Sequence, residues 1–245
     1  MPDIQEPAAV QVPSTGPIPE THPTKNNSTQ HEQAATIPTA QPEQTSIAPT
    51  QQATLHTARL KFVPLAASHY ALTKELDQDP EVMKHIGFGR PLTDDETKQV
   101  HEWLLKSSTS VPGQGTWVAY AGEEAIGWWI LAPTPIDAAK PTENFSAVRS
   151  ETGYRLLRGH WGKGYATEGS LGLIKHAFED LGLEEVFGET MTVNTASRKV
   201  MAKCGLTHVD TWFNTYPTPP PGIEEGEVRY RITRGEWQGR NSASN

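Results

Sequence analysis

Two glycines bracket a lysine at the point where a strand-like pattern gives way to a helical one. Gly162, Lys163 and Gly164 follow a strand predicted at about 152–157 and precede a helix predicted at about 165–181. Glycine has no Cβ, so the backbone can turn tightly there and approach a ligand closely. The helix that follows offers unpaired N–H groups and a positive dipole end. The combination predicts a phosphate-binding loop, although an ordinary strand-to-helix turn would also explain the two glycines.

Two common glycine-rich phosphate motifs do not fit this loop. A Walker A loop needs Ser or Thr after its lysine, but Gly164 follows Lys163, and Gly159 stands too close to Gly162. A dinucleotide-binding fingerprint needs a third glycine, but Thr167 occupies that position. The loop also lies late in the chain, after several predicted strands. A different kind of phosphate binder is therefore indicated.

Further motifs flank the loop in a fixed order. They are Asp79-Pro80-Glu81-Val82-Met83, Phe88-Gly89-Arg90-Pro91-Leu92, the loop itself as Trp161-Gly162-Lys163-Gly164-Tyr165-Ala166, Asn194-x-x-Ser197, and Lys203-Cys204-Gly205-Leu206. Over about residues 57–237 the chain resembles the GNAT acyltransferase superfamily, in particular its branch related to the ribosomal-protein acetyltransferases RimJ and RimL. The superfamily's loop reads Gln/Arg-x-x-Gly-x-Gly/Ala. Trp161 departs from that pattern but is common in the RimJ/RimL-like branch.

The resemblance implies an α/β (α+β) fold with a mixed, splayed central sheet of about seven strands flanked by about four helices. It also implies acetyl-CoA as co-substrate. In this superfamily the pantetheine arm lies between two parallel strands that part and bonds their free backbone groups, while the pyrophosphate meets the loop. The cofactor-binding residues so implied are Leu156, Leu157, Met191, Val193, Asn194, Trp161, Gly162, Lys163, Gly164, Tyr165, Ala166 and Thr167.

Two of these positions also have simpler explanations. Lys163 could add positive charge near a CoA phosphate or could be a solvated lysine on a turn. Asn194 could hold the pantetheine or could serve as the N-cap of the helix that follows it.

Transfer of an acetyl group to an amine requires two proton movements. The acceptor is a cation near neutral pH and must lose a proton before it attacks. The departing thiolate needs a proton, and well-positioned groups with a modest acid and base can supply this chemistry. Backbone N–H groups can stabilise the negative charge that develops on the carbonyl oxygen.

Ser197 is the candidate general acid. It stands four residues before Met201 and seven before Cys204, so the three share one helix face. The RimL-like members imply that this serine lies near the CoA sulfur. Alternatively, Ser197 occupies the third position of its helix and satisfies the helix end.

Glu151 is the candidate general base, because many GNAT relatives carry a glutamate at the start of the strand before the loop. A solvated glutamate at the strand edge, with water removing the proton, is the alternative. Cys204 is expected to be a buried small hydrophobe rather than a nucleophile. Trp128 and Trp129 alternate across one strand, so one should face the acceptor cleft and the other the core. None of the nine histidines has zinc-ligand spacing, so no metal is expected.

Composition divides the chain. Residues 1–56 are rich in Pro, Thr, Gln and Ala and contain no Phe, Trp or Tyr, which predicts a disordered tail. The acetyltransferase domain is predicted at 57–237 and a flexible C-terminus at 238–245. The formal net charge of −8 argues against a nucleic-acid binder. No signal-peptide pattern or transmembrane window occurs, and a single cysteine fits a reducing compartment, so a cytoplasmic monomer or homodimer away from membranes is expected.

Hydrophobic periodicity and turn residues give the expected elements. Strands are predicted at about 58–63, 116–121, 125–131, 152–157, 185–193, 207–213 and 227–233, and helices at about 66–76, 93–107, 165–181 and 195–204. Thr93 and Asn194 are expected to be helix N-caps. A proline-rich connection is expected over 132–149.

The sequence therefore predicts an acetyl-CoA-dependent N-acetyltransferase that works by direct attack in a ternary complex. Its acceptor would be a protein N-terminal amine or a small-molecule amine. Two alternatives stay open: a catalytically silent acyl-CoA-binding module of the same fold, and a protein whose tail is a tether for a partner.

Overall fold

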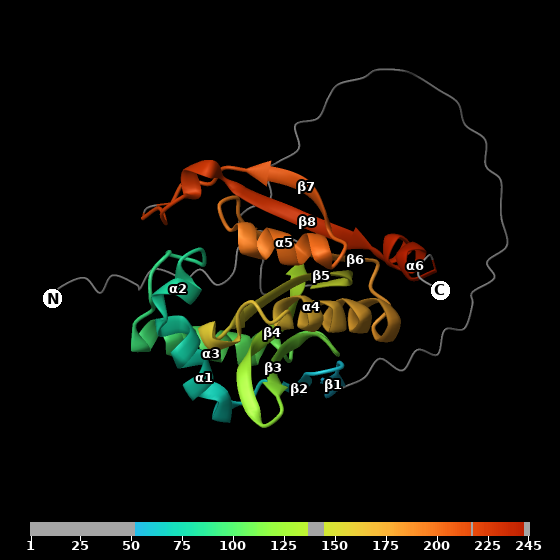
Figure 1. Ribbon diagram of the computed structural model, residues 1–245, viewed down its shortest axis with the longest axis horizontal. Helices are drawn as coiled ribbons and strands as arrows, with labels where there is room; N and C mark the ends of the chain where they lie inside the picture. The colour runs from blue at the N-terminus through green and yellow to red at the C-terminus, as the bar shows by residue number, and fades with distance from the viewer. Residues whose placement is uncertain (1–51, 137–144, 217, 243–245) are drawn as a thin grey trace, which may run out of the picture.

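A single mixed sheet organises the protein (Figure 1). The computed structural model describes residues 52–136, 145–216 and 218–242. Within these described residues the sheet has eight strands in the order β1-β2-β3-β4-β5-β6-β8-β7. Their bounds are β1 Leu55–His56, β2 Lys61–Pro64, β3 Gly115–Ala121, β4 Glu124–Pro135, β5 Phe145–Leu156, β6 Glu185–Met191, β7 Thr207–Trp212 and β8 Glu227–Thr233.

Six α-helices occur in the described part of the chain. They are α1 Tyr70–Gln78, α2 Pro80–Met83, α3 Asp94–Ser107, α4 Tyr165–Lys175, α5 Thr195–Lys203 and α6 Arg234–Ser242, and α4 continues into a π-helical turn over His176–Asp180. The sequence predicts four of these and misses α2 and α6. With four residues, α2 is too short to show a hydrophobic period, and its cap at Asp79 is what marks it. The helix α6 is polar and is held by tertiary contacts: its Trp237 ring lies 6.1 Å from that of Phe178.

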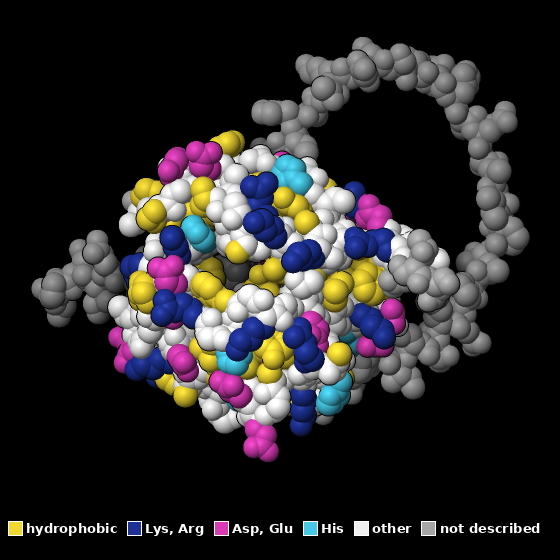
Figure 2. Space-filling view, viewed as in Figure 1, with side chains coloured by type: hydrophobic (Ala, Val, Ile, Leu, Met, Phe, Trp, Pro, Cys, Tyr) yellow, Lys and Arg dark blue, Asp and Glu magenta, His cyan; other side chains and the backbone are white. Residues whose placement is uncertain are grey.

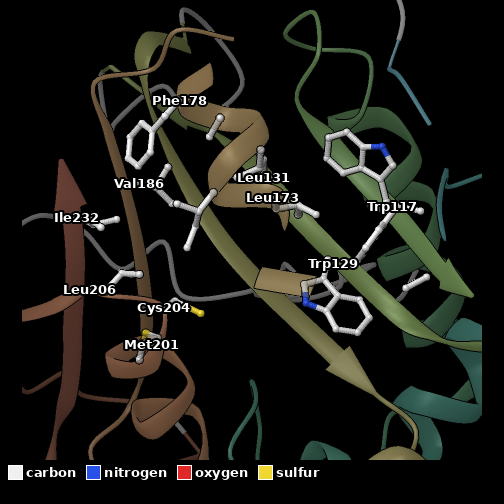
Figure 3. Packing of buried hydrophobic residues seen from close by; sticks show 14 of the residues in the cluster. Trp117, Trp129, Leu131, Leu173, Phe178, Val186, Met201, Cys204, Leu206 and Ile232 are labelled. Atoms are coloured by element: carbon white, nitrogen blue, oxygen red, sulfur yellow. The ribbon is translucent and has the colours of Figure 1, made fainter. Parts of the chain in front are cut away.

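Hydrophobic side chains form a core on each face of the sheet. One core joins α4 and α5 to the sheet, and Figure 3 shows Leu173 of α4 near its middle, with Trp117 and Trp129 on one side and Met201 and Cys204 on the other. The second core joins α1, α2 and α3 to the opposite face and includes Trp128. The two adjacent tryptophans therefore point to opposite faces, as their alternation predicts, but each is buried in a hydrophobic core, so the expectation that one faces an acceptor cleft stays a prediction.

The parallel strands β5 and β6 separate part-way along their length. They pair over three residue pairs, the last of which is Glu151 with Phe187. Beyond it, β5 continues to Leu156 as a partner of β4, and β6 continues to Met191 as a partner of β8. A gap therefore opens between two strands of the same sheet.

A glycine stands where the gap begins. A Cβ on Gly188 would lie 3.2 Å from the carbonyl oxygen of Thr152 and 3.0 Å from Sδ of Met201. Both separations are tighter than ordinary van der Waals contact, so a glycine suits this close approach. The separation of β5 and β6 confirms the mixed, splayed sheet that the resemblance implies.

Both N-caps expected from the sequence are confirmed. Thr93 and Glu96 form a capping box, in which the Thr93 hydroxyl accepts from the Glu96 N–H at 3.3 Å and the Glu96 carboxylate accepts from the Thr93 N–H at 2.8 Å. Asn194 Oδ1 accepts from the N–H of Ser197 at 3.2 Å. These local bonds set where α3 and α5 begin.

The ends of the domain differ from the predicted boundaries. Residues 52–56 fall in the predicted tail, yet Leu55 pairs with Phe62, and the Trp117 indole donates to the carbonyl of Ala53 at 2.7 Å. Residues 238–242, predicted to be flexible, belong to α6. The predicted connection at 132–149 contains the end of β4 and the start of β5, and residues 137–144 within it lie outside the described residues, as does the tail over 1–51.

We expect two N-terminal truncations to differ in stability. Removing residues 1–51 should leave the free energy of unfolding unchanged within about 0.5 kcal/mol, because that segment has no aromatic side chains to bury. Removing 1–56 should cost about 1–3 kcal/mol, because it deletes β1 and the hydrogen bonds of Gln52 and Ala53 to β3. Urea unfolding of the two truncated proteins tests this, and equal stabilities would contradict it.

Candidate active site

The predicted phosphate loop has the backbone shape that it needs. Gly162 and Gly164 have φ of +73° and +83°, in the left-handed region that favours glycine. Gly164 is the N-cap of α4 and offers no side chain to its N–H groups, whereas Asp79, Thr93 and Asn194 cap α2, α3 and α5. A Cβ on Gly162 would meet no atom within 4 Å, so the space beside it is open. The loop thus presents backbone N–H groups to a space that can receive an anion.

On the β5 side of the gap, hydrogen bonds show which backbone groups face it. Leu157 donates its N–H to a β4 carbonyl at 2.9 Å, and its own carbonyl accepts from the loop after it. The carbonyl of Leu156 accepts from the Trp161 indole at 2.7 Å. Successive residues of a strand turn their N–H and C=O groups to alternate sides. Thr152, Tyr154 and Leu156 therefore face the gap.

This alternation corrects part of the sequence prediction. Leu157 has its N–H committed to β4, so it cannot offer the extra-strand donor that the resemblance implies. Thr152 and Tyr154 have the correct direction, and the sequence prediction omits them. The two-residue alternation along a strand would have identified them from Leu156, because every second residue has its backbone groups on the same side.

On the β6 side, Met191 has the expected direction. Thr192 donates its N–H to the carbonyl of Gly226, on the side of β8, at 2.9 Å, so its neighbour Met191 faces the gap. The Met191 carbonyl accepts from Asn194 and the Val193 carbonyl from Thr195, at 2.9 and 2.8 Å. These bonds build the turn into α5 and place the predicted residues Met191, Val193 and Asn194 at the mouth of the gap.

The Asn194 side chain is engaged within the protein. Its Oδ1 accepts from Ser197 N–H, and its Nδ2 donates to the Thr190 hydroxyl at 3.0 Å. This geometry confirms the N-cap, and the contact with pantetheine stays a prediction.

Ser197 reaches across the gap. It lies in the first turn of α5, after β6, and its side chain lies beside the phenol of Tyr154 of β5. Tyr154 stacks on Trp129 with ring centres 5.8 Å apart. Burial raises the pKa of Tyr154 to about 12, so its phenol keeps its proton at neutral pH. The side chains of Ser197 and Tyr154 thus lie together between the two arms of the gap.

Glu151 lies on the opposite face of the sheet. It shares the side-chain direction of Arg155, which contacts Trp128 and pairs with Asp77 of α1. Glu151 is only 9% exposed, because β5 is flanked by β4 and β6, so the alternative of a solvated strand-edge glutamate is wrong. It also stands in the middle of β5 rather than at its start.

Burial and a neighbouring acid perturb Glu151. The loss of solvent raises the pKa of its carboxyl well above the ordinary value of 4.5, and the negative charge of Glu189 raises it further. The positive charges of Arg229 and Arg149 oppose this rise in pKa. Arg229 donates to Glu189 at 2.6 Å, so part of its charge is already neutralised. Perturbed carboxyl groups of this kind are common at catalytic sites.

The thiol of Cys204 is unreactive in this structure. Cys204 is 1% exposed, and burial raises the pKa of its thiol to about 12, so little thiolate exists at neutral pH. This agrees with the expectation of a small buried hydrophobe. Among the described residues, no group of three or more His, Cys, Asp and Glu side chains is arranged to hold a metal ion.

A hollow is visible on the face that carries the gap. Figure 2 shows it near the centre of the view, rimmed by hydrophobic side chains, with Lys and Arg side chains above and below it. In the same view of Figure 1, the hollow lies between α5 and the segment that leads into α4. A hydrophobic rim with basic surroundings suits a ligand with an extended arm and phosphates.

The Acetyltransferase (GNAT) domain model matches residues 59–207, more than half of the chain. The chain belongs to the GNAT acetyltransferase family. FsC-acetyl coenzyme A-N(2)-transacetylase of Aspergillus fumigatus is 60% identical over 186 residues, which cover 76% of this chain and 78% of that protein. This GNAT member is therefore an N-acetyltransferase with acetyl-CoA as co-substrate and an amine as acceptor.

Solved structures share the fold at low sequence identity. A spermidine N-acetyltransferase from Vibrio cholerae, in complex with CoA and spermine, has a TM-score of 0.59 at 15% identity and covers 74% of this chain and 99% of its own. RimL, a ribosomal L7/L12 alpha-N-protein acetyltransferase in complex with coenzyme A, has a TM-score of 0.58 at 15% identity, covering 72% and 95%. These similarities support the GNAT fold.

The residues at the gap fit acetyl-CoA. The loop offers N–H groups and open space beside Gly162, and the strands offer backbone groups of Thr152, Tyr154 and Met191. The Thr152 hydroxyl is buried with no hydrogen-bond partner within the described ranges. Of the helices in the described part of the chain, none is long and apolar enough to cross a membrane.

Proposed function

We propose that this GNAT enzyme acetylates a small-molecule amine, and specifically the N(2) amine of the FsC acceptor that its Aspergillus fumigatus relative is named for. The 60% identity to that transacetylase over 78% of its length carries the proposal. A protein N-terminus, the acceptor in the name of RimL, is supported only at 15% identity.

Binding would use the two features already described. The N–H groups of the loop from Gly162 to Thr167 would hold the pyrophosphate, and the gap-facing backbone of β5 and β6 would hold the pantetheine arm. Trp161 and Tyr165 would flank the loop, and Lys163 would add charge at its exposed tip. Acetyl-CoA supplies the acetyl group as an activated thioester.

The acid and the base would act from opposite faces of the sheet. Glu151 faces the α1–α3 side and Ser197 the α4–α5 side, so a proton can be taken from the acceptor on one side and given to sulfur on the other. The raised pKa of Glu151 makes it a stronger base than an ordinary carboxylate. The Ser197 hydroxyl, beside the protonated Tyr154 phenol, would donate its proton to the departing sulfur and regain one from solvent.

The state of the thiol supports direct attack of the amine in a ternary complex. A covalent route would need a nucleophile, but Cys204 is buried and protonated. With the acetyl donor and the amine held together, orientation supplies much of the rate.

A competition experiment tests the acceptor. The purified enzyme with acetyl-CoA would be offered FsC, spermidine and a peptide with a free N-terminus, each followed by intact mass and by thiol release. One acetyl group on FsC at N(2), at a kcat/KM at least about tenfold above the other amines, is expected. Preference for the peptide or the polyamine would contradict the acceptor, and binding of acetyl-CoA without thiol release with any amine would indicate a silent module.

We expect Ser197→Ala to lower kcat more than it weakens acetyl-CoA binding. An acid that acts on the departing sulfur matters in the transition state, so its loss appears in kcat. The decrease should be near the lower end of the ~10²–10⁴-fold range of acid–base catalysis, because water can substitute. Steady-state kinetics with one confirmed amine, and calorimetry with CoA, measure the two quantities.

A matched variant separates catalysis from capping. Thr195 lies in the same first turn of α5, and its side chain is exposed. The variant Thr195→Ala should therefore keep the wild-type kcat. If Ser197→Ala retains the wild-type kcat at every pH, the acid role is wrong.

A further inference from the structure

Arg59 lies outside every motif that identified the site, yet it contacts the phosphate loop and the first turn of α4. It stands between β1 and β2, near the start of the described residues. Its Nη1 donates to the carbonyl of Lys163 at 3.0 Å, and its Nε donates to Oε2 of Glu168 at 2.6 Å. Its guanidinium carbon lies 4.5 Å from the centre of the Tyr165 ring. One side chain thus contacts both sides of the N-cap Gly164.

Glu168 is held by further bonds from the same segment. Its Oε1 accepts from the backbone N–H of Arg59 at 2.8 Å and from the Thr57 hydroxyl at 2.6 Å. Thr57 in turn accepts from the N–H of Leu60 at 3.1 Å. The carboxylate is therefore fixed by the 57–60 segment.

The bond to Lys163 sets the direction of one peptide group. No cis peptide occurs among the described residues, and in a trans peptide the C=O and the following N–H point in opposite directions. Because Arg59 draws the Lys163 carbonyl toward itself, the N–H of Gly164 must point away from Arg59. That N–H belongs to the uncapped end of α4.

The bond to Glu168 changes the charge at the same place. A carboxylate in the first turn of α4 interacts favourably with the helix dipole, but it repels an anion bound at that end of the helix. Arg59 places a positive charge against it. The side chains are 48% and 17% exposed, and pairs with this much solvent contribute little to folding stability. Orientation of the loop and compensation of charge are therefore the larger consequences.

We propose that Arg59 is a positioning residue for the co-substrate. It turns the Gly164 N–H toward the pyrophosphate of acetyl-CoA and offsets the charge of Glu168 beside it. This inference rests on the proposed role of the 162–167 loop. It makes binding of acetyl-CoA depend on the 57–60 segment, more than 100 residues before the loop in sequence.

The first test is calorimetry of CoA binding to Arg59→Gln. The Kd should rise about tenfold or more, the effect of losing one hydrogen bond to a charged ligand. Arg90→Gln is the matched control, because Arg90 pairs with Glu96 in the first turn of α3 at 2.7 Å and has the same 48% exposure. Its Kd for CoA should stay at the wild-type value, and both variants should unfold at similar temperatures.

A second ligand distinguishes positioning from direct contact. Dephospho-CoA keeps the pyrophosphate and lacks the 3′-phosphate, so Arg59→Gln should weaken it by the same factor as CoA. A loss confined to CoA would make Arg59 a ligand of the 3′-phosphate and overturn the proposal. In ¹H–¹⁵N spectra, the CoA-induced shift of the Gly164 amide should shrink in Arg59→Gln and persist in Arg90→Gln.

A third variant separates this proposal from the one on which it rests. If Gly164→Val weakens CoA and a folded Arg59→Gln does not, the loop binds phosphate and the role of Arg59 is wrong. If neither variant changes the Kd, the loop itself has been misassigned, and both proposals fail. Adding Glu168→Gln to Arg59→Gln should recover part of the lost affinity, and no recovery would contradict the charge compensation.

Discussion

Gly164→Val should weaken CoA binding by roughly 10- to 100-fold, the effect of losing one or two hydrogen bonds to a charged group. Gly164 has φ of +83°, and a Cβ there would lie 3.4 Å from Nη2 of Arg59. A β-branched side chain disfavours that backbone conformation and occupies the space beside the N–H groups of α4. Calorimetry with CoA measures the loss.

Gly122→Val is the control for backbone strain. Gly122 has φ of +66° and stands in the turn between β3 and β4, and a Cβ there would meet no atom within 4 Å. Both variants carry the cost of a left-handed conformation, about 1–2 kcal/mol in stability. Only Gly164→Val should lose affinity. Unchanged affinity in a folded Gly164→Val protein would disprove phosphate binding by the loop.

Glu151→Gln should lower kcat by about 10²–10⁴-fold near neutral pH, the usual contribution of a general base. The amide has almost the shape of the protonated carboxyl, so CoA affinity should change little. In the wild type, activity should rise with pH as Glu151 loses its proton, at a pH well above its ordinary pKa of 4.5. The variant should recover part of its activity at high pH, where more of the acceptor amine is already neutral.

Two measurements identify the cause of that loss. Glu151→Asp retains a carboxylate and should keep the rising limb of the pH–rate profile at reduced kcat. If Glu151→Gln keeps both the wild-type kcat and the wild-type profile, water or another group is the base.

The same substitution has a predictable effect on stability. The folded pKa of Glu151 is raised above its unfolded value, so the folded state binds the proton more tightly. Its contribution to stability is complete below the unfolded pKa and is lost as pH rises through the folded pKa. Glu151→Gln removes that titration, so the free energy of unfolding of the variant should increase relative to that of the wild type as pH rises above 4.5, the ordinary pKa of the group. Urea unfolding at several pH values tests the sign.

Local signals were sufficient to predict most elements and the loop. Thr93 and Asn194 mark helix starts because their side chains bond N–H groups three residues away. Gly162 and Gly164 mark the loop because few other residues adopt its backbone angles. Each of these signals acts over a few residues, so a single sequence carries it in full.

The environment of the catalytic candidates depends on packing. The sequence offers no sign that Glu151 is buried, because β5 becomes a central strand only when β4 and β6 pair with it. Burial raises its pKa most, Glu189 raises it further and Arg229 opposes the rise, and these two residues come from two later strands. The placement of Ser197 beside Tyr154 likewise brings α5 and β5 together across the gap.

Short-range backbone chemistry and hydrophobic period thus determine the loop and the order of the elements in this chain, and the ordered motifs carry its resemblance to the family. The direction of the Gly164 N–H depends on Arg59, more than 100 residues earlier. The ionisation of Glu151 depends on which charges the sheet brings beside it. Electrostatic and hydrogen-bond energies depend on distance in space, and sheet pairing sets those distances between residues far apart in sequence.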